Sequence, residues 1–93
     1  MFSKNEIRLF DKRYFNILRI THEENFVEIQ SKNTKDYWVI KKNVYYDDWE
    51  IYIYHKHPRS KYYHRHWQCH SIKQSIKSIY SHDQYRLNKR LYM

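Results

Sequence analysis

The most informative segment of this 93-residue chain is residues 49–82, WEIYIYHKHPRSKYYHRHWQCHSIKQSIKSIYSH. Trp49, Ile51 and Ile53 occupy alternate positions between polar and tyrosine residues, and this period of two predicts a β-strand. Pro58 follows at the second position of HPRS, which suits a type I turn. The segment therefore predicts a strand, a tight turn, a second strand and then a helix.

A helix is predicted over residues 71–82. Ser71 and Gln74 have the spacing of a capping box, in which each side chain satisfies a backbone N–H at the start of the helix. The apolar residues that recur at i, i+4, i+7 and i+8 are Ile72, Ile76, Ile79 and Tyr80. This apolar stripe predicts that the helix packs on the sheet. We expect one domain over residues 1–83, followed by a basic C-terminal tail at 84–93.

Three more strands are predicted upstream, at residues 14–21, 26–30 and 37–42, because these segments are rich in β-branched and aromatic residues. Polar clusters at 22–25 and 31–36 separate them as turns. Residues 5–21 also fit a helical stripe, so a helix there stays open as an alternative.

The expected fold is of the α+β class. It is an antiparallel β-sheet meander of five to six strands, with one C-terminal amphipathic helix packed on one face. Its expected core includes Trp49, Ile51, Ile53, Ile72, Ile76 and Ile79.

The chain contains no glycine, so any turn position with a positive φ must be occupied by another residue type. Asparagine and aspartate are the next most tolerant residue types. The positions predicted to carry a positive φ are Asn25, Asn33, Asn43 and Asp47 or Asp48.

The predicted hairpin has one apolar face and one basic, aromatic face. A two-residue loop pairs Tyr54 with Tyr63 and Tyr52 with Arg65, and paired residues share a face. The face opposite the core then carries Tyr52, Tyr54, Lys56, Lys61, Tyr63 and Arg65. A loop one residue longer replaces the last three with Tyr62, His64 and His66.

The charge of the chain is concentrated in its second half. Residues 51–93 carry nine Lys or Arg and one acid, Asp83, which accounts for the whole net charge of +8. Clustered cations with exposed rings are typical of proteins that bind nucleic-acid backbones and stack on bases. We therefore expect non-catalytic binding of DNA or RNA. The expected phosphate contacts are Lys56, Arg59, Lys61 and Arg65, the expected stacking residues are Tyr52, Tyr54 and Tyr63, and the tail cations are Arg86, Lys89 and Arg90.

The order of sheet, turn, sheet and capped helix over residues 37–82 resembles the arm-type DNA-binding domains of phage integrases and their plant relatives. The resemblance is one of topology, and it implies a three-stranded sheet, backed by one helix, that enters the major groove. The glycine that those domains usually carry before the helix is missing from this chain.

Two His-x-His pairs on neighbouring strands are the candidate metal ligands, namely His55, His57, His64 and His66. Several imidazoles on one face are what zinc requires. In the register of the two-residue loop, His55, His64 and His66 share the face of Ile51 and Ile53, at the edge of the core. No C-x-x-C or H-E-x-x-H spacing is present. We therefore expect ordinary strand histidines, and no metal or other cofactor.

Catalysis is not expected, because Cys69 and His70 are adjacent and adjacent residues of a strand point to opposite faces. The alternative function is that of an inhibitor or adaptor of phage type, for example anti-CRISPR-like. It would bind a host nucleic-acid-processing protein through the same Tyr/Arg-rich surface, because these residue types dominate binding hot spots.

The rest of the composition bears on location and origin. A single cysteine excludes an internal disulfide and fits a reducing compartment. No apolar run is long enough for a signal sequence or a membrane span, so we expect a cytoplasmic protein that does not enter membranes. Abundant Lys, Asn, Ile and Tyr without glycine indicate an A/T-rich gene, such as one from a phage or mobile element. Edge strands leave both a monomer and a dimer open.

Overall fold

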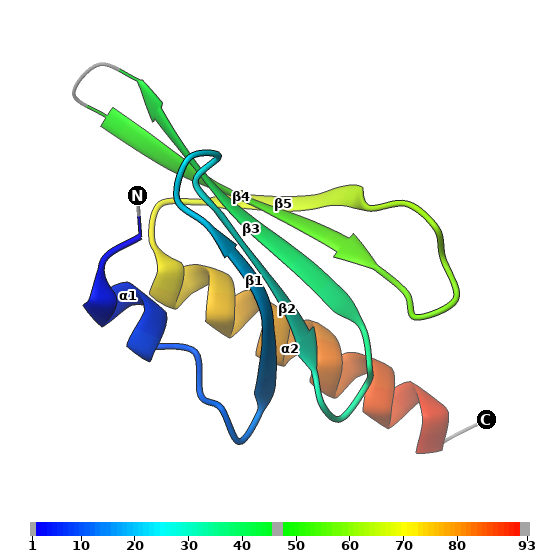
Figure 1. Ribbon diagram of the computed structural model, residues 1–93. Helices are drawn as coiled ribbons and strands as arrows, with labels where there is room; N and C mark the ends of the chain where they lie inside the picture. The colour runs from blue at the N-terminus through cyan, green and yellow to red at the C-terminus, as the bar shows by residue number, and fades with distance from the viewer. Residues whose placement is uncertain (1, 46–47, 92–93) are drawn as a thin grey trace.

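Five antiparallel strands form one sheet in which each strand pairs with its neighbours in the sequence, and α2 lies along one face (Figure 1). The computed structural model describes residues 2–45 and 48–91. The elements are α1 (Lys4–Arg8), β1 (Phe15–Thr21), β2 (Phe26–Ser31), β3 (Tyr37–Tyr45), β4 (Asp48–Lys56), β5 (His64–Cys69) and α2 (Ile72–Leu91). The predicted α+β meander with a C-terminal helix is confirmed.

Strand alternation sorts the side chains of the sheet into two layers. Along β2, Val27 and Ile29 are buried, whereas Glu28 between them is only partly buried. The apolar residues of the covered face join those of the helices in one core, which contains Phe2, Phe10, Phe15, Val27, Ile29, Trp38, Ile40, Ile51, Ile53, Cys69, Ile72, Ile76 and Ile79. The five isoleucines predicted for the core at 51, 53, 72, 76 and 79 are buried, and Trp49 packs partly buried against them.

The sequence left either a helix or a strand open over residues 5–21. The structure contains both, a short helix followed by a strand. A capping box starts α1, because Ser3 Oγ accepts from the Glu6 N–H at 3.1 Å and Glu6 Oε1 accepts from the Ser3 N–H at 2.9 Å. The helix ends after five residues, and the aromatic and β-branched residues from Phe15 onward form β1.

The helix α2 is longer than the predicted 71–82. At its start, Ser71 accepts from the Gln74 N–H at 3.1 Å, and Gln74 reaches back to the N–H of His70. The helix then continues to Leu91, so residues 84–91 of the expected basic tail are helical. Neither glycine nor proline follows residue 82 to end it. No helix in the described residues is long and apolar enough to cross a membrane.

The predicted register of the hairpin is wrong. Tyr54 pairs with Arg65 instead of Tyr63, and the register shifts again between Ile53 and Tyr54, as at a β-bulge. The loop therefore spans residues 57–63. It includes the expected turn at Pro58, because the Ser60 N–H donates to the His57 carbonyl at 3.0 Å. Near the loop the observed pairing differs from the predicted pairing by two residues. Because side chains alternate with a period of two, a shift of two leaves each side chain on its predicted face.

Two described residues other than glycine have a positive φ, Asn25 (53°) and Lys35 (66°). The prediction is confirmed for Asn25 and is wrong for Asn33 and Asn43. The prediction of Asp47 or Asp48 stays open, because Asp47 lies outside the described residues. Lys35 was not anticipated, because Asn33 in the same turn is the better residue type for this conformation.

Candidate nucleic-acid interface and histidine cluster

The sheet face opposite α2 is here called the open face. Its charged, aromatic and aliphatic side chains are all partly or fully exposed. These residues are Arg19, Phe26, Glu28, Tyr37, Val39, Lys41, Asp48, Glu50, Tyr52, Tyr54, Lys56 and Arg65, with Tyr63 from the adjoining loop. Five of the predicted binding residues, at 52, 54, 56, 63 and 65, therefore lie together on this face.

Cations on the open face lie over aromatic rings. The Arg65 guanidinium carbon is 4.3 Å from the centroid of the Tyr52 ring, and the Lys56 Nζ is 4.5 Å from that of Tyr37. Lys56 Nζ is also 5.2 Å from the Tyr63 ring. Such cation–π contacts hold the side chain over the ring while its N–H groups remain able to donate.

Two tyrosine hydroxyls on the open face are bonded to carboxylates. Tyr63 donates to Glu28 Oε2 at 2.7 Å, and Tyr52 donates to Glu50 Oε2 at 2.7 Å. Burial and the hydrogen bond to Glu28 both raise the pKa of Tyr63. The first bond ties the loop before β5 down onto β2, so Tyr63 adds its ring to the sheet surface.

The loop between β4 and β5 extends this surface with exposed side chains. Arg59 and Lys61 are both exposed, as predicted for phosphate contacts. Tyr62 is 82% exposed, the largest value among the large hydrophobic residues described.

Two of the predicted tail cations do not join the open face. Arg86 lies on the covered side, where it donates to Asp36 Oδ2. Lys89 is exposed on α2, and the side chain of Arg90 lies outside the described part of the chain. The structure therefore separates Arg86 and Lys89 from the other candidates.

Histidines gather on the covered side of the sheet, around Trp38. This histidine cluster consists of His55, His57, His64, His66 and His82. His55 is its centre, with ring centroids 4.6 Å from His82, 4.7 Å from His57 and 5.2 Å from His64. The four predicted candidate ligands are thus brought together, on the face that strand alternation predicted for three of them.

A buried carboxylate lies against the histidine cluster. Asp36 is fully buried, and its Oδ2 is 2.9 Å from His55 Nε2 and accepts from Arg86. Burial opposes ionisation of Asp36, but the His55 and Arg86 hydrogen bonds outweigh it and lower the pKa to about 2. Burial, together with the neighbouring imidazoles of His82, His55 and His64, lowers the pKa of His66 to about 4. At neutral pH the site therefore contains an ionised carboxylate and a neutral His66 imidazole.

The sequence interpretation missed Asp36 and His82 as members of this site. Asp36 precedes Trp38 by two residues, so strand alternation would have placed both on the covered face. Position 82 follows Ile79 by three residues and precedes Arg86 by four, which continues the helical face of the isoleucines. Both signals were present, but the predicted helix ended at residue 82.

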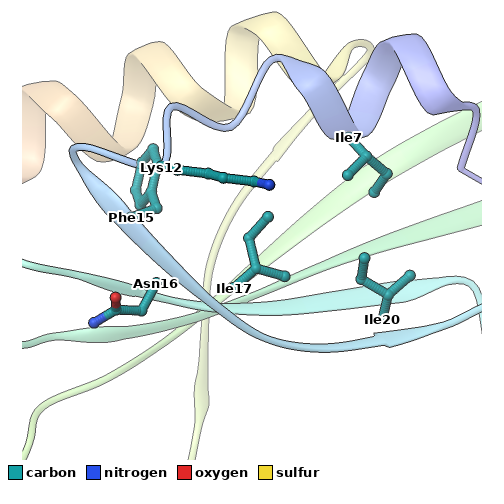
Figure 2. A pocket seen from close by; sticks show the side chains of 6 residues that line it. All are labelled: Ile7, Lys12, Phe15, Asn16, Ile17 and Ile20. Carbon is teal, nitrogen blue, oxygen red and sulfur yellow. The ribbon is translucent and has the colours of Figure 1, made fainter.

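A cavity of about 480 Å³ lies between α1 and β1 (Figure 2). Its lining is mostly apolar, from Ile7, Lys12, Phe15, Asn16, Ile17 and Ile20. Lys12 extends over it from the loop that follows α1, and Asn16 is the other polar side chain. It has no carboxylate, histidine or cysteine among its lining residues, so the open face and the histidine cluster remain the sites with the more specific chemistry.

Comparisons with protein-family models, with curated proteins and with solved structures found no match to this chain.

Proposed function

We propose that this protein binds single-stranded nucleic acid through its open face, without catalysis. The observation that carries the proposal is the interleaving of rings and cations on a sheet surface that no helix covers. A flat array of aromatic rings stacks on bases of any sequence, while neighbouring Lys and Arg attract the phosphates.

The charge balance of this surface supports an anionic ligand. The open face and the loop at 57–63 together carry six Lys or Arg, at positions 19, 41, 56, 59, 61 and 65, against three acids at 28, 48 and 50. Glu28 and Glu50 accept from tyrosine hydroxyls and hold rings in place. These two acids therefore have a structural role on a surface that is positive overall.

The geometry favours single strands over duplexes. The rings at 37, 52, 54 and 63 come from three neighbouring segments and form a surface, and bases in a duplex do not expose their faces to such a surface. Binding in the major groove, as the integrase-like topology implied, would instead use the loop at 57–63 as its leading edge.

The test is fluorescence anisotropy with labelled single-stranded DNA, single-stranded RNA and duplex DNA across a salt series. Tyr54→Ala is expected to weaken single-strand binding about 5- to 100-fold through lost stacking. Arg65→Ala and Lys56→Ala are each expected to reduce the salt slope by about 0.7. Lys73→Ala and Lys77→Ala are the matched controls, because they remove the same charge from the exposed side of α2.

Equal effects of the open-face and α2 variants would contradict the proposal, because binding would then follow net charge alone. The absence of binding at about 100 mM salt would contradict it as well. The second outcome would favour the alternative role, that of an inhibitor or adaptor of a host protein.

A further inference from the structure

Four elements meet at one point on the covered side of the sheet. Asp36 precedes β3, His55 lies in β4, His66 in β5 and His82 in α2. One ligand atom each from Asp36, His55 and His82 lie within 4.8 Å of one another. Asp36 and His55 are buried, and the His82 side chain is 20% exposed.

Two buried polar atoms at this point have no hydrogen-bond partner within the described chain, Asp36 Oδ1 and His82 Nδ1. The nearest charged neighbours are too distant, since His57 Nδ1 is 3.8 Å from Asp36 Oδ1 and Asp83 Oδ1 is 3.9 Å from His82 Nδ1. A buried polar atom without a hydrogen-bond partner is destabilising. Both atoms belong to residues whose ligand atoms lie within 4.8 Å of one another, which indicates a shared ligand.

We propose that Asp36, His55 and His82 bind one divalent transition-metal ion of the zinc class, with His66 as the fourth ligand. Nitrogen-rich donor sets with one carboxylate suit zinc, whereas magnesium and calcium prefer oxygen throughout.

The spacing of the imidazoles fits such an ion. With Zn–N distances of about 2.0–2.1 Å and tetrahedral angles, two ligating rings have centroids about 5 Å apart. The observed centroid separations are 4.6 Å for His55 and His82, 5.2 Å for His66 and His82, and 5.8 Å for His55 and His66. Aromatic packing alone also gives such spacings, so the two unpartnered atoms are the observation that distinguishes a ligand set from a ring cluster.

The charges and the surrounding hydrogen bonds also suit a cation. Asp36 and Asp83 are both buried, and Arg86 is paired with Asp36. Arg86 holds Asp36 Oδ2 and leaves Oδ1 free, as expected of a neighbour that orients a ligating carboxylate. Asp83 is held separately, by the hydroxyls of Tyr14 and Thr34.

The ion would be structural. Its ligands come from both layers, three from the sheet side and His82 from α2, so the bound metal would fix the helix on the sheet. Small domains with limited cores commonly depend on such a link, and the free energy of metal binding then becomes folding free energy. This inference does not depend on the proposed nucleic-acid binding, because β4 presents His55 and the open face on opposite sides.

The test uses untagged full-length protein that has been treated with EDTA and dialysed. Zn²⁺ is then titrated in competition with a chromophoric chelator, and thermal unfolding is followed with Zn²⁺ or Mg²⁺ alone. The expected result is one Zn²⁺ per chain and a rise in Tm with Zn²⁺ only. Co²⁺ in place of Zn²⁺ is expected to give the intense visible absorption of a tetrahedral site.

His82→Phe is the decisive variant, because it keeps a ring against Trp38 but removes the ligand nitrogen. It is expected to weaken Zn²⁺ binding at least about 100-fold. Because Nδ1 of His82 has no hydrogen-bond partner in the described chain, the variant should fold, which circular dichroism checks; His82→Ala serves if it does not. The matched controls are His22→Ala and His70→Ala, which remove exposed histidines outside the cluster.

Absence of stoichiometric Zn²⁺ binding would overturn the proposal. So would binding that is unchanged in the His82 variants, since the ion would then be held by surface histidines such as His57 and His64.

Discussion

Arg86 in α2 donates a hydrogen bond to the buried carboxylate of Asp36, 50 positions earlier in the chain. The contact joins the part of α2 beyond the predicted helix end to the start of β3. Removal of one partner from a buried ion pair leaves the other uncompensated in an apolar surrounding.

Arg86→Ala is therefore expected to lower the free energy of unfolding by about 2–4 kcal/mol, since Asp36 keeps only its bond to His55. Urea unfolding measures the change. Lys89→Ala, an exposed cation one turn later in the same helix, should change stability by less than about 0.5 kcal/mol. A similar loss in both variants would show that α2 is stabilised by its general charge instead of this contact.

Lys35→Gly is expected to stabilise the protein by about 0.5 kcal/mol. Lys35 has a φ of 66°, a conformation that costs a residue with a Cβ atom about 1–2 kcal/mol, and glycine avoids this at a smaller entropic cost. Differential scanning calorimetry should show a higher Tm. Lys32→Gly in the same turn lacks this benefit and should lower the Tm, so a decrease in both variants would rule out strain at Lys35.

The stability that Glu6 contributes should depend on pH. Burial opposes ionisation of Glu6, but hydrogen bonds from Ser3 and the ion pair with Lys42 outweigh it, so its pKa is lowered from the ordinary 4.5. A lowered folded-state pKa stabilises the protein above the ordinary value, and this contribution is lost as the pH falls below 4.5.

Glu6→Gln is therefore expected to cost about 0.5–1 kcal/mol at pH 7 and much less at pH 3. Urea unfolding of both proteins at the two pH values gives the comparison. The exposed Glu23→Gln serves as the control and should change stability by less than about 0.5 kcal/mol at either pH. An unchanged cost of Glu6→Gln at pH 3 would contradict the role of its charge.

If the open face binds nucleic acid, Glu28→Gln should strengthen binding about two- to fivefold at low salt, because it removes a negative charge from the centre of that face. The amide oxygen still accepts from Tyr63, so the loop should keep its position. Fluorescence anisotropy with labelled single-stranded DNA measures the affinity. Glu23→Gln makes the same charge change in the turn between β1 and β2, and an equal gain there would place the binding elsewhere.

The fold was largely predictable because its determinants are periodic. The alternation through Ile51 and Ile53 and the helical recurrence of Ile72, Ile76 and Ile79 each depend on local geometry alone. The same alternation of side chains predicted that His55, His64 and His66 lie on the core face, where the structure shows their rings in contact.

The remaining features depend on tertiary contacts. The bulge between Ile53 and Tyr54 changes the register by one residue without a signal in composition. The end of α2 was missed because its last turns are held by Asp83 and Arg86, polar residues whose partners are elsewhere in the chain. The proximity of Asp36 and His82 likewise depends on how α2 packs on the sheet. The periodicity of the sequence does not specify that packing.

The strand order also bears on how quickly the chain folds. Because every strand pairs with its sequence neighbours, each pairing needs closure of only a short segment, which favours rapid folding for a β-rich domain. Side-chain bonds span much greater sequence separations, such as that of Tyr14 with Asp83, 69 positions apart. The sheet should therefore be assembled in the transition state for folding, and the far end of α2 should dock after it.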